Sequence, residues 1–177
     1  MAKRLTLADA FFLNAESRDA YMHVAMLHRY QILMVPGGFS YGDDVAEVAE
    51  NLGRPLTPEQ RRAVDVLVAH DARGRFLSIE AGLEGPRQTV GKSGAIMLPI
   101  ALWTAFTDPD YITWTAHLAE TSQKQFADLC GSDPDDESGL ITSCDWLRRR
   151  VRRPSYENGS EGVSFLNRAE IAFKVRS

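Results

Sequence analysis

This chain of 177 residues has few cysteines, no long apolar run and no excess of positive charge. Its two cysteines, Cys130 and Cys144, form no CxxC pair, which excludes a cysteine-based zinc site and favours two reduced thiols. No run of about 18 apolar residues and no secretory signal occurs, so we expect a cytoplasmic protein without a membrane span. The formal net charge of −4 means that any nucleic acid must be bound through a local basic patch.

The composition that is present is ordinary for a globular protein. Apolar residues make up 44% and charged residues 25% of the chain, and these fractions exclude a mostly disordered protein. A chain of this length forms one domain by default.

The first half of the chain contains several predictable elements. Apolar spacing predicts a helix over residues 43–52, ended by Gly53 and Pro55. A second helix starts at Pro58, because Thr57 is a good N-cap residue and Gln60 stands three places later. The other elements expected here are a helical stretch over residues 1–30, a turn or loop at residues 36–38 and a strand over residues 75–84.

The second half alternates between helix and strand. Pro99 lies inside an apolar helix over residues 91–106 and predicts a kink or break there. The remaining expected elements are a strand at 111–116, a helix at 121–130 capped by Thr121 or Ser122, an acidic loop at 131–139, a basic helix at 140–153, a turn at Asn158-Gly159, and a hairpin of 163–166 with 170–175. A strand–helix–strand order predicts a parallel sheet with flanking helices, and the hairpin is expected to leave an unpaired edge.

Residues 85–93, GPRQTVGKS, carry the clearest functional pattern. Gly91, Lys92 and Ser93 match the second half of the phosphate loop G-x-x-x-x-G-K-[ST], whereas Pro86 stands where the first glycine is expected. The expected strand before and helix after the loop would aim backbone N–H groups at an anion. The pattern predicts that Lys92 reaches the β- and γ-phosphates and that Ser93 binds Mg²⁺. The alternative is a chance Gly-Lys-Ser at a helix start.

Several blocks in the same order resemble the large subunits of bacteriophage terminases, the ATP-driven motors that package viral DNA. The resemblance covers residues 42–177 and implies that they form an incomplete α/β domain, preceded by a segment of unclear role, residues 1–41. The loop of this chain has one residue more between Gln88 and Gly91 than the common family form. The blocks are SYGDDVAEVAENLGRPLTPEQ, GPRQTVGKS with its Pro-Arg-Gln, ITWTAHLAETSQKQFADL, WLRRRVRR and NGSEGVSFLNRAEIAFKVRS.

This resemblance implies a partial P-loop NTPase of the ASCE or RecA-like type that binds ATP and Mg²⁺. It places Gln60 at the adenine edge, Arg87 on the γ-phosphate and Ser93 on the metal, while His117 is interpreted as structural. The implied partners are double-stranded DNA, the terminase small subunit, the portal and further copies in a ring. The implied nucleotide-binding residues are Gln60, Pro86, Arg87, Gln88, Thr89, Val90, Gly91, Lys92 and Ser93.

No apolar run ending in Asp-Glu follows Ser93, although an ATPase of this class needs such a Walker B strand. The resemblance places that strand and a nuclease domain beyond Ser177. We therefore expect a fragment that binds nucleotide weakly and does not hydrolyse it alone. Gln60 also fits a capping box, so its adenine role has a structural alternative.

One basic cluster is present, and it consists of Arg148, Arg149, Arg150, Arg152 and Arg153. It is a candidate for contacts with DNA phosphates. The alternatives are a solvated helix face or contacts within a motor ring.

Three other functions compete with the terminase interpretation. LTPEQRRAV before the phosphate loop also resembles helicase entry motifs. VPGGFSYGDD, residues 35–44, resembles a glutamine amidotransferase subunit, but neither cysteine stands on the sharp turn that a nucleophile needs. A non-enzymatic remnant that only binds a partner is the third possibility.

Overall fold

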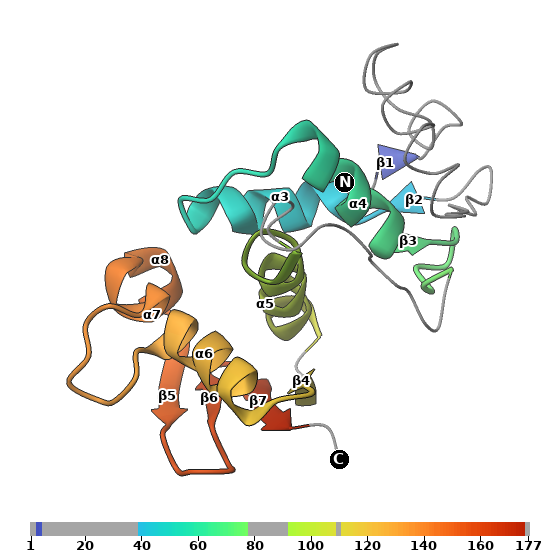
Figure 1. Ribbon diagram of the computed structural model, residues 1–177. Coiled ribbons are helices and arrows are strands. Elements are labelled where there is room, and N and C mark those ends of the chain that lie inside the picture. The colour runs from blue at the N-terminus through green and yellow to red at the C-terminus, as the bar shows by residue number, and fades with distance from the viewer. Residues whose placement is uncertain (1–2, 5–38, 78–91, 109–110, 176–177) are drawn as a thin grey trace, which may run out of the picture. The chain divides into compact units, whose positions relative to one another are not determined.

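The computed structural model describes residues 3–4, 39–77, 92–108 and 111–175 (Figure 1). The chain divides into two compact units. The first consists of Met1–Ala46 and Leu56–Val90, and the second of Glu47–Pro55 and Gly91–Ser177. The loop expected at 36–38 and most of the strand expected at 75–84 lie outside the described residues. So does the helical stretch expected over residues 1–30, except for residues 3–4, which form a strand instead.

The first unit combines two helices with a small antiparallel sheet. The sheet has the order β1-β2-β3, formed by β1 (Lys3–Arg4), β2 (Phe39–Ser40) and β3 (Ala69–His70). Helix α3 (Gly42–Asn51) begins here, and its bounds confirm the predicted helix within one residue. Gly53 follows it with a φ of +71°, a backbone conformation that glycine adopts at low cost.

Helix α4 (Pro58–Leu67) begins as the sequence predicts. The hydroxyl of Thr57 accepts a hydrogen bond from the Gln60 backbone N–H at 3.3 Å, and the Gln60 side-chain oxygen accepts one from the Thr57 N–H at 2.9 Å. This reciprocal capping box satisfies two N–H groups at the helix start that no carbonyl of the helix can reach.

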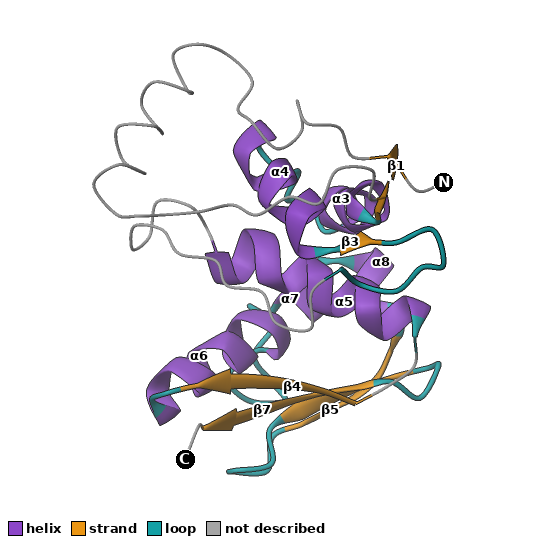
Figure 2. Ribbon diagram, turned by 90° about the vertical axis from the view of Figure 1, so that its right-hand side faces the viewer, coloured by secondary structure: helices purple, strands orange, loops and turns teal. Residues whose placement is uncertain are grey.

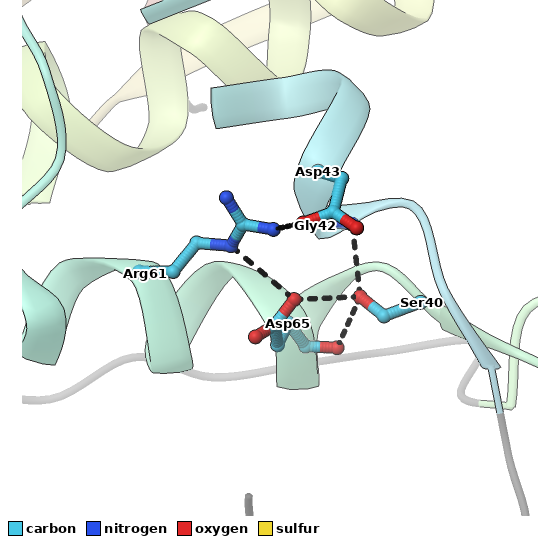
Figure 3. Close-up of polar contacts among 5 residues, drawn as sticks. All are labelled: Ser40, Gly42, Asp43, Arg61 and Asp65. Atoms are coloured by element: carbon cyan, nitrogen blue, oxygen red, sulfur yellow. Dashed lines mark hydrogen bonds and ion pairs between the residues drawn. The ribbon is translucent and has the colours of Figure 1, made fainter. Parts of the chain in front are cut away.

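A buried polar network joins the start of α3 to α4 (Figure 3). The fully buried Ser40 hydroxyl accepts from the Gly42 N–H at 2.9 Å and donates to Asp65, whose Oδ1 lies 3.1 Å away. The carboxylate of Asp65 is buried and is faced by the Arg61 guanidinium at 3.5 Å, which also pairs with Asp43. A Cβ atom on Gly42 would lie 1.8 Å from Asp65 Oδ1, so only glycine fits there.

The second unit is built on a four-stranded mixed sheet of order β4-β7-β6-β5. Its strands are β4 (Tyr111–Ala116), β5 (Val151–Ser155), β6 (Gly162–Phe165) and β7 (Glu170–Val175). Its helices are η1 (Lys92–Met97), α5 (Leu98–Thr107), α6 (Ala119–Cys130), α7 (Leu140–Ser143) and α8 (Asp145–Arg148). Figure 2 shows α5 and α6 on the same side of the sheet.

The helix-facing side of the sheet carries the core of this unit. Pairing in register sets Trp114 of β4 beside Phe173 of β7, with ring centroids 5.9 Å apart. Phe126 of α6 packs its ring edge-on against Phe173 at 5.5 Å. Phe126 and Phe173 are buried, and burying a side chain of this size contributes about 1.5–3 kcal/mol.

Several predictions for this unit are confirmed. The strand at 111–116 and the hairpin of β6 with β7 are present, and Gly159 of the predicted turn has a φ of +80°. Around Pro99 the helix changes from the π form of η1 to the α form of α5. Proline has no N–H and its ring crowds the carbonyl four residues earlier, at Ala95, so the preceding turn widens.

The predicted basic helix at 140–153 is wrong. The chain forms two short helices, α7 and α8, and then turns into β5 at Val151. Helix propensity of the arginines is overridden by pairing of β5 with β6. Arg148 therefore ends a helix, while Arg152 and Arg153 belong to a strand.

Three further expectations need correction. Helix α6 begins at Ala119 with Leu118 as its N-cap, so neither Thr121 nor Ser122 caps it. Ser122 is instead buried, and its hydroxyl donates to the Lys174 carbonyl at 3.3 Å. The hairpin does not leave β7 at an edge, because β7 lies between β4 and β6. Among the described strands of this sheet only β4 and β7 are parallel, so the sheet is mixed.

The steric fit at Gly42 gives a direct test of the buried network. Gly42→Ala should lower the free energy of unfolding by about 2 kcal/mol or more, because the new methyl group displaces Asp65. In an Asp65→Ala background the same substitution should cost less than about 1 kcal/mol. Equilibrium urea unfolding of the four proteins measures both values. Equal costs in the two backgrounds would contradict the packing described here.

Candidate functional site

The candidate phosphate-binding residues Lys92 and Ser93 stand at the start of a continuous helical segment, η1 followed by α5. Lys92 is half-buried and Ser93 is exposed. The first N–H groups of a helix lack carbonyl partners within it, and the helix dipole makes this end positive. The segment has no acidic residue in its first turn. Residues 86–91 of the predicted loop lie outside the described residues.

The π form of η1 distinguishes this start from an ordinary helix. A π-helix of six residues, Lys92–Met97, is rare, and such turns occur frequently at functional sites. Ile96, Leu98 and Leu102 along η1 and α5 are buried. The segment is therefore fixed by its later turns, while its first residues stay accessible.

Gln60 belongs to the first unit, and its side chain has a structural task. Its carbonyl oxygen accepts the Thr57 N–H at 2.9 Å and completes the capping box of α4. The residue is half-buried. Capping occupies one of the two lone pairs of that oxygen, so the structure supports the capping interpretation, and an adenine contact stays a prediction.

The basic cluster separates into arginines with different surroundings. Arg150 is half-buried, and its guanidinium carbon lies 4.1 Å from the centre of the Trp146 ring and 5.8 Å from that of Phe106. Its Nη1 also donates to the Trp146 carbonyl at 2.8 Å. Arg148 pairs with Asp145. The side chains of these two arginines are therefore engaged in contacts within the second unit.

The other three arginines of the cluster, Arg149, Arg152 and Arg153, are exposed. In the part of the chain that the structure describes, no side-chain hydrogen bond or ion pair engages them. They are the members of the cluster that can meet a phosphate backbone without breaking an internal contact.

The acidic loop at 131–139 is held together by its own hydrogen bonds. Asp136 accepts from the Ser132 N–H and hydroxyl, both at 2.7 Å, and from the Ser138 N–H at 2.9 Å. The backbone N–H of Ser132 and the bonds from Ser138 hold the pKa of Asp136 well below its usual range. Across the described ranges, no three His, Cys, Asp or Glu side chains are grouped as metal ligands.

Neither cysteine is placed as a nucleophile. Burial raises the pKa of the Cys130 thiol to about 12, which keeps it protonated. Cys144 is half-buried, and its thiol donates to the Asn51 carbonyl at 3.3 Å. This geometry gives no support to the amidotransferase alternative. His117 is exposed just after β4.

The sequence analysis did not single out Ser40, Asp65 or His70, which are buried polar side chains. His70 of β3 is only 5% exposed and stacks on Tyr41, with ring centroids 3.9 Å apart. Its Nδ1 lies 2.7 Å from the Asp71 carbonyl. No periodicity marks this histidine in the sequence, because β3 has only two residues.

Two open depressions of about 320 and 440 Å³ lie beside α6. They are lined by Gln123 of α6 together with Asn158 and Glu161 of the loop before β6. Neither includes Lys92 or Ser93. A polyphosphate is recognised by N–H groups and cations rather than by the volume of a depression, so the helix start suits it better than either depression does.

Comparisons with protein-family models, with curated proteins and with solved structures gave no match for this chain. In the described ranges, no helix combines the length and the apolar character that crossing a bilayer requires.

The two cysteines should differ sharply in reactivity. At pH 8 a thiol with a pKa of about 12 is ionised in about one molecule in ten thousand, so iodoacetamide should modify Cys144 in the native protein and spare Cys130. Mass spectrometry of the Cys144→Ser variant isolates the buried thiol, which should react only after unfolding in urea. Rapid labelling of Cys130 in the native protein would show that this burial is wrong.

Proposed function

We propose that this chain is the ATP-binding part of a terminase large subunit, a motor that packages viral double-stranded DNA. The observation that carries the proposal is the helix start at Lys92, where the Gly-Lys-Ser pattern coincides with a first turn free of acidic residues. Lysine and serine at this position suit a polyphosphate with its Mg²⁺ ion. The ordered blocks that resemble terminases favour this motor over other P-loop enzymes.

The finer fold proposed is a P-loop NTPase of the ASCE or RecA-like type. The α/β character of the second unit and the parallel pairing of β4 with β7 agree with such a fold. In this class of protein, ligands bind at the carboxyl ends of parallel strands, next to helix starts. The residues proposed to bind ATP are Gln60, the loop residues 86–91, Lys92 and Ser93, with Arg87 acting on the γ-phosphate and Ser93 on Mg²⁺.

The proposed partners are double-stranded DNA, the terminase small subunit, the portal and further copies of the chain in a ring. For DNA the support is local, because Arg149, Arg152 and Arg153 are exposed while the chain as a whole carries a net charge of −4. A helicase would share the nucleotide site. A remnant that only binds a partner would lack it, and nucleotide titration distinguishes that case.

Lys92 provides the first test of the nucleotide site. Lys92→Ala should weaken binding of ATP–Mg²⁺ by about tenfold to a hundredfold, because a charge-assisted contact to the β- and γ-phosphates is lost. Titration with a fluorescent ATP analogue measures the change. Lys124→Ala removes the same charge from the exposed surface of α6 and should bind like the wild type. Equal affinities of the Lys92→Ala variant and the wild type would remove the assignment.

The capping role of Gln60 and its proposed contact with adenine can be separated by a substitution. Gln60→Glu keeps the capping box, since glutamate accepts the Thr57 N–H equally well, so the free energy of unfolding should change by less than about 0.5 kcal/mol. The carboxylate cannot donate to adenine, however, and the preference for ATP over GTP should fall severalfold. Competition binding with both nucleotides gives the result. An unchanged preference would leave Gln60 as a capping residue alone.

The exposed arginines make a separate prediction for DNA. Arg152→Ala and Arg153→Ala should each weaken binding to a duplex of any sequence and lower the slope of log affinity against log salt concentration by about one. Arg150→Lys is the control, because it keeps the positive charge and should leave that slope unchanged. Fluorescence anisotropy over a salt series measures the slopes. Identical slopes for all variants would exclude these arginines from the contact.

A further inference from the structure

The two depressions beside α6 adjoin and form one groove, the α6 groove. Both are lined by Gln123, Asn158 and Glu161, so they are parts of one continuous surface. Helix α6 forms one wall, and the loop between β5 and β6 forms the other. The lining runs from Ala119, the first residue of α6, to Ser132 just beyond its end. The 12 residues of α6, at a rise of about 1.5 Å each, make the groove about 18 Å long.

The three side chains that line both depressions have no partner within the described ranges. No side-chain hydrogen bond or ion pair engages Gln123, Asn158 or Glu161 there. Each of the two amides can donate and accept hydrogen bonds, and the carboxylate accepts them. The backbone of Glu161 is fixed, because its carbonyl accepts the Phe173 N–H at 2.8 Å. The groove therefore offers an amide on each wall and a carboxylate on the loop wall.

Negative charge predominates around the groove. Glu161 is a half-buried carboxylate of its lining. Burial raises the pKa of Tyr156, which also lines the groove, and the negative charges of Asp133 and Asp136 raise it further. Lys124 belongs to the lining and brings one positive charge against these three carboxylates.

The ammonium group of Lys174 adds no positive charge to the groove, although this residue belongs to the lining. Its Nζ lies 5.6 Å from the centre of the Tyr111 ring of β4. Tyr111 and Trp114 stand three residues apart in one strand, so their side chains point to opposite faces of the sheet. Trp114 lies on the face that α6 covers, through its contact with Phe173. The lysine side chain therefore extends to the other face, and the groove favours a cationic occupant.

We propose that the α6 groove binds a short extended segment of a partner protein that carries arginine or lysine. An extended chain rises about 3.3 Å per residue, so about five or six residues fit the length of the groove. Peptide groups both donate and accept, and so match the amides of Gln123 and Asn158, while a basic side chain pairs with Glu161. The carboxylates repel the phosphates of nucleic acid. This inference is independent of the nucleotide site, because neither Lys92 nor Ser93 lines the groove.

Fluorescence anisotropy of the full 177-residue chain with a labelled hexapeptide of alternating alanine and arginine tests the proposal. The peptide should bind, and its affinity should fall as the salt concentration rises. Glu161→Gln keeps the shape of the side chain and should weaken binding by about fivefold to tenfold. Gln123→Arg adds a cation at an exposed helix position and should weaken it as well. Glu170→Gln is the control, because it removes an exposed carboxylate of β7 outside the groove and should bind like the wild type.

Four results would overturn the proposal. Equal affinity of the wild type and Glu161→Gln, with both proteins folded by their thermal unfolding curves, would exclude the groove as the binding site. Equal binding of a hexapeptide of alternating alanine and glutamate would exclude recognition by charge. Displacement of the arginine peptide by spermidine at equal concentration would show that the groove selects charge alone and not a peptide. Self-association of the chain in sedimentation that Glu161→Gln abolishes would make a second copy, and not a partner, the occupant.

Discussion

The parallel pairing of β4 with β7 is the constraint on which the second unit depends. Parallel neighbours cannot be joined by a tight turn, so the chain between Ala116 and Glu170 must leave the sheet and return. On the way it forms α6, α7 and α8 and then adds β5 and β6 beyond β7. The same register sets Trp114 beside Phe173 under Phe126, so strand pairing and core packing support each other.

This core also fixes the helix on which the functional account rests. Burial of Ile96, Leu98 and Leu102 contributes about 1.5–3 kcal/mol for each side chain, and the three together exceed the cost of about 3 kcal/mol for one proline inside a helix. Pro99 is therefore tolerated, and the turn before it widens to the π form. At the other end of α5, Asn167 donates to the Ala105 carbonyl at 2.6 Å and attaches the β6–β7 turn. The helix is held firmly while Ser93 stays exposed.

Local chemistry explains which parts of the fold could be predicted from the sequence. The capping box of Thr57 and Gln60, the break at Pro99 and the turn at Gly159 all arise from neighbouring residues. The prediction of a helix at 140–153 was wrong because β5 is formed by hydrogen bonds to β6, and no local sequence pattern indicates that pairing. The prediction of Ser122 as a cap was wrong for the same reason, since its hydroxyl donates to the carbonyl of Lys174, 52 residues away.

The residues of the candidate site also differ in whether the sequence alone could indicate their role. Lys92 and Ser93 could be found because the Gly-Lys-Ser pattern is contiguous and precedes an apolar helix. The separation of Arg150 from the exposed arginines, by contrast, needs the positions of Trp146 and Phe106. Motifs thus indicate the chemistry, while folding determines which charges surround it.

The proposed function requires the first turn of η1 to bind a polyphosphate through its backbone N–H groups. Two-dimensional ¹H–¹⁵N NMR of the labelled chain during titration with ATP–Mg²⁺ observes those groups directly. Large, saturable changes in chemical shift are expected for the amides of Lys92, Ser93 and Gly94, with little change at Ser164 in β6. Saturation of shifts elsewhere, with these three amides unmoved, would contradict it.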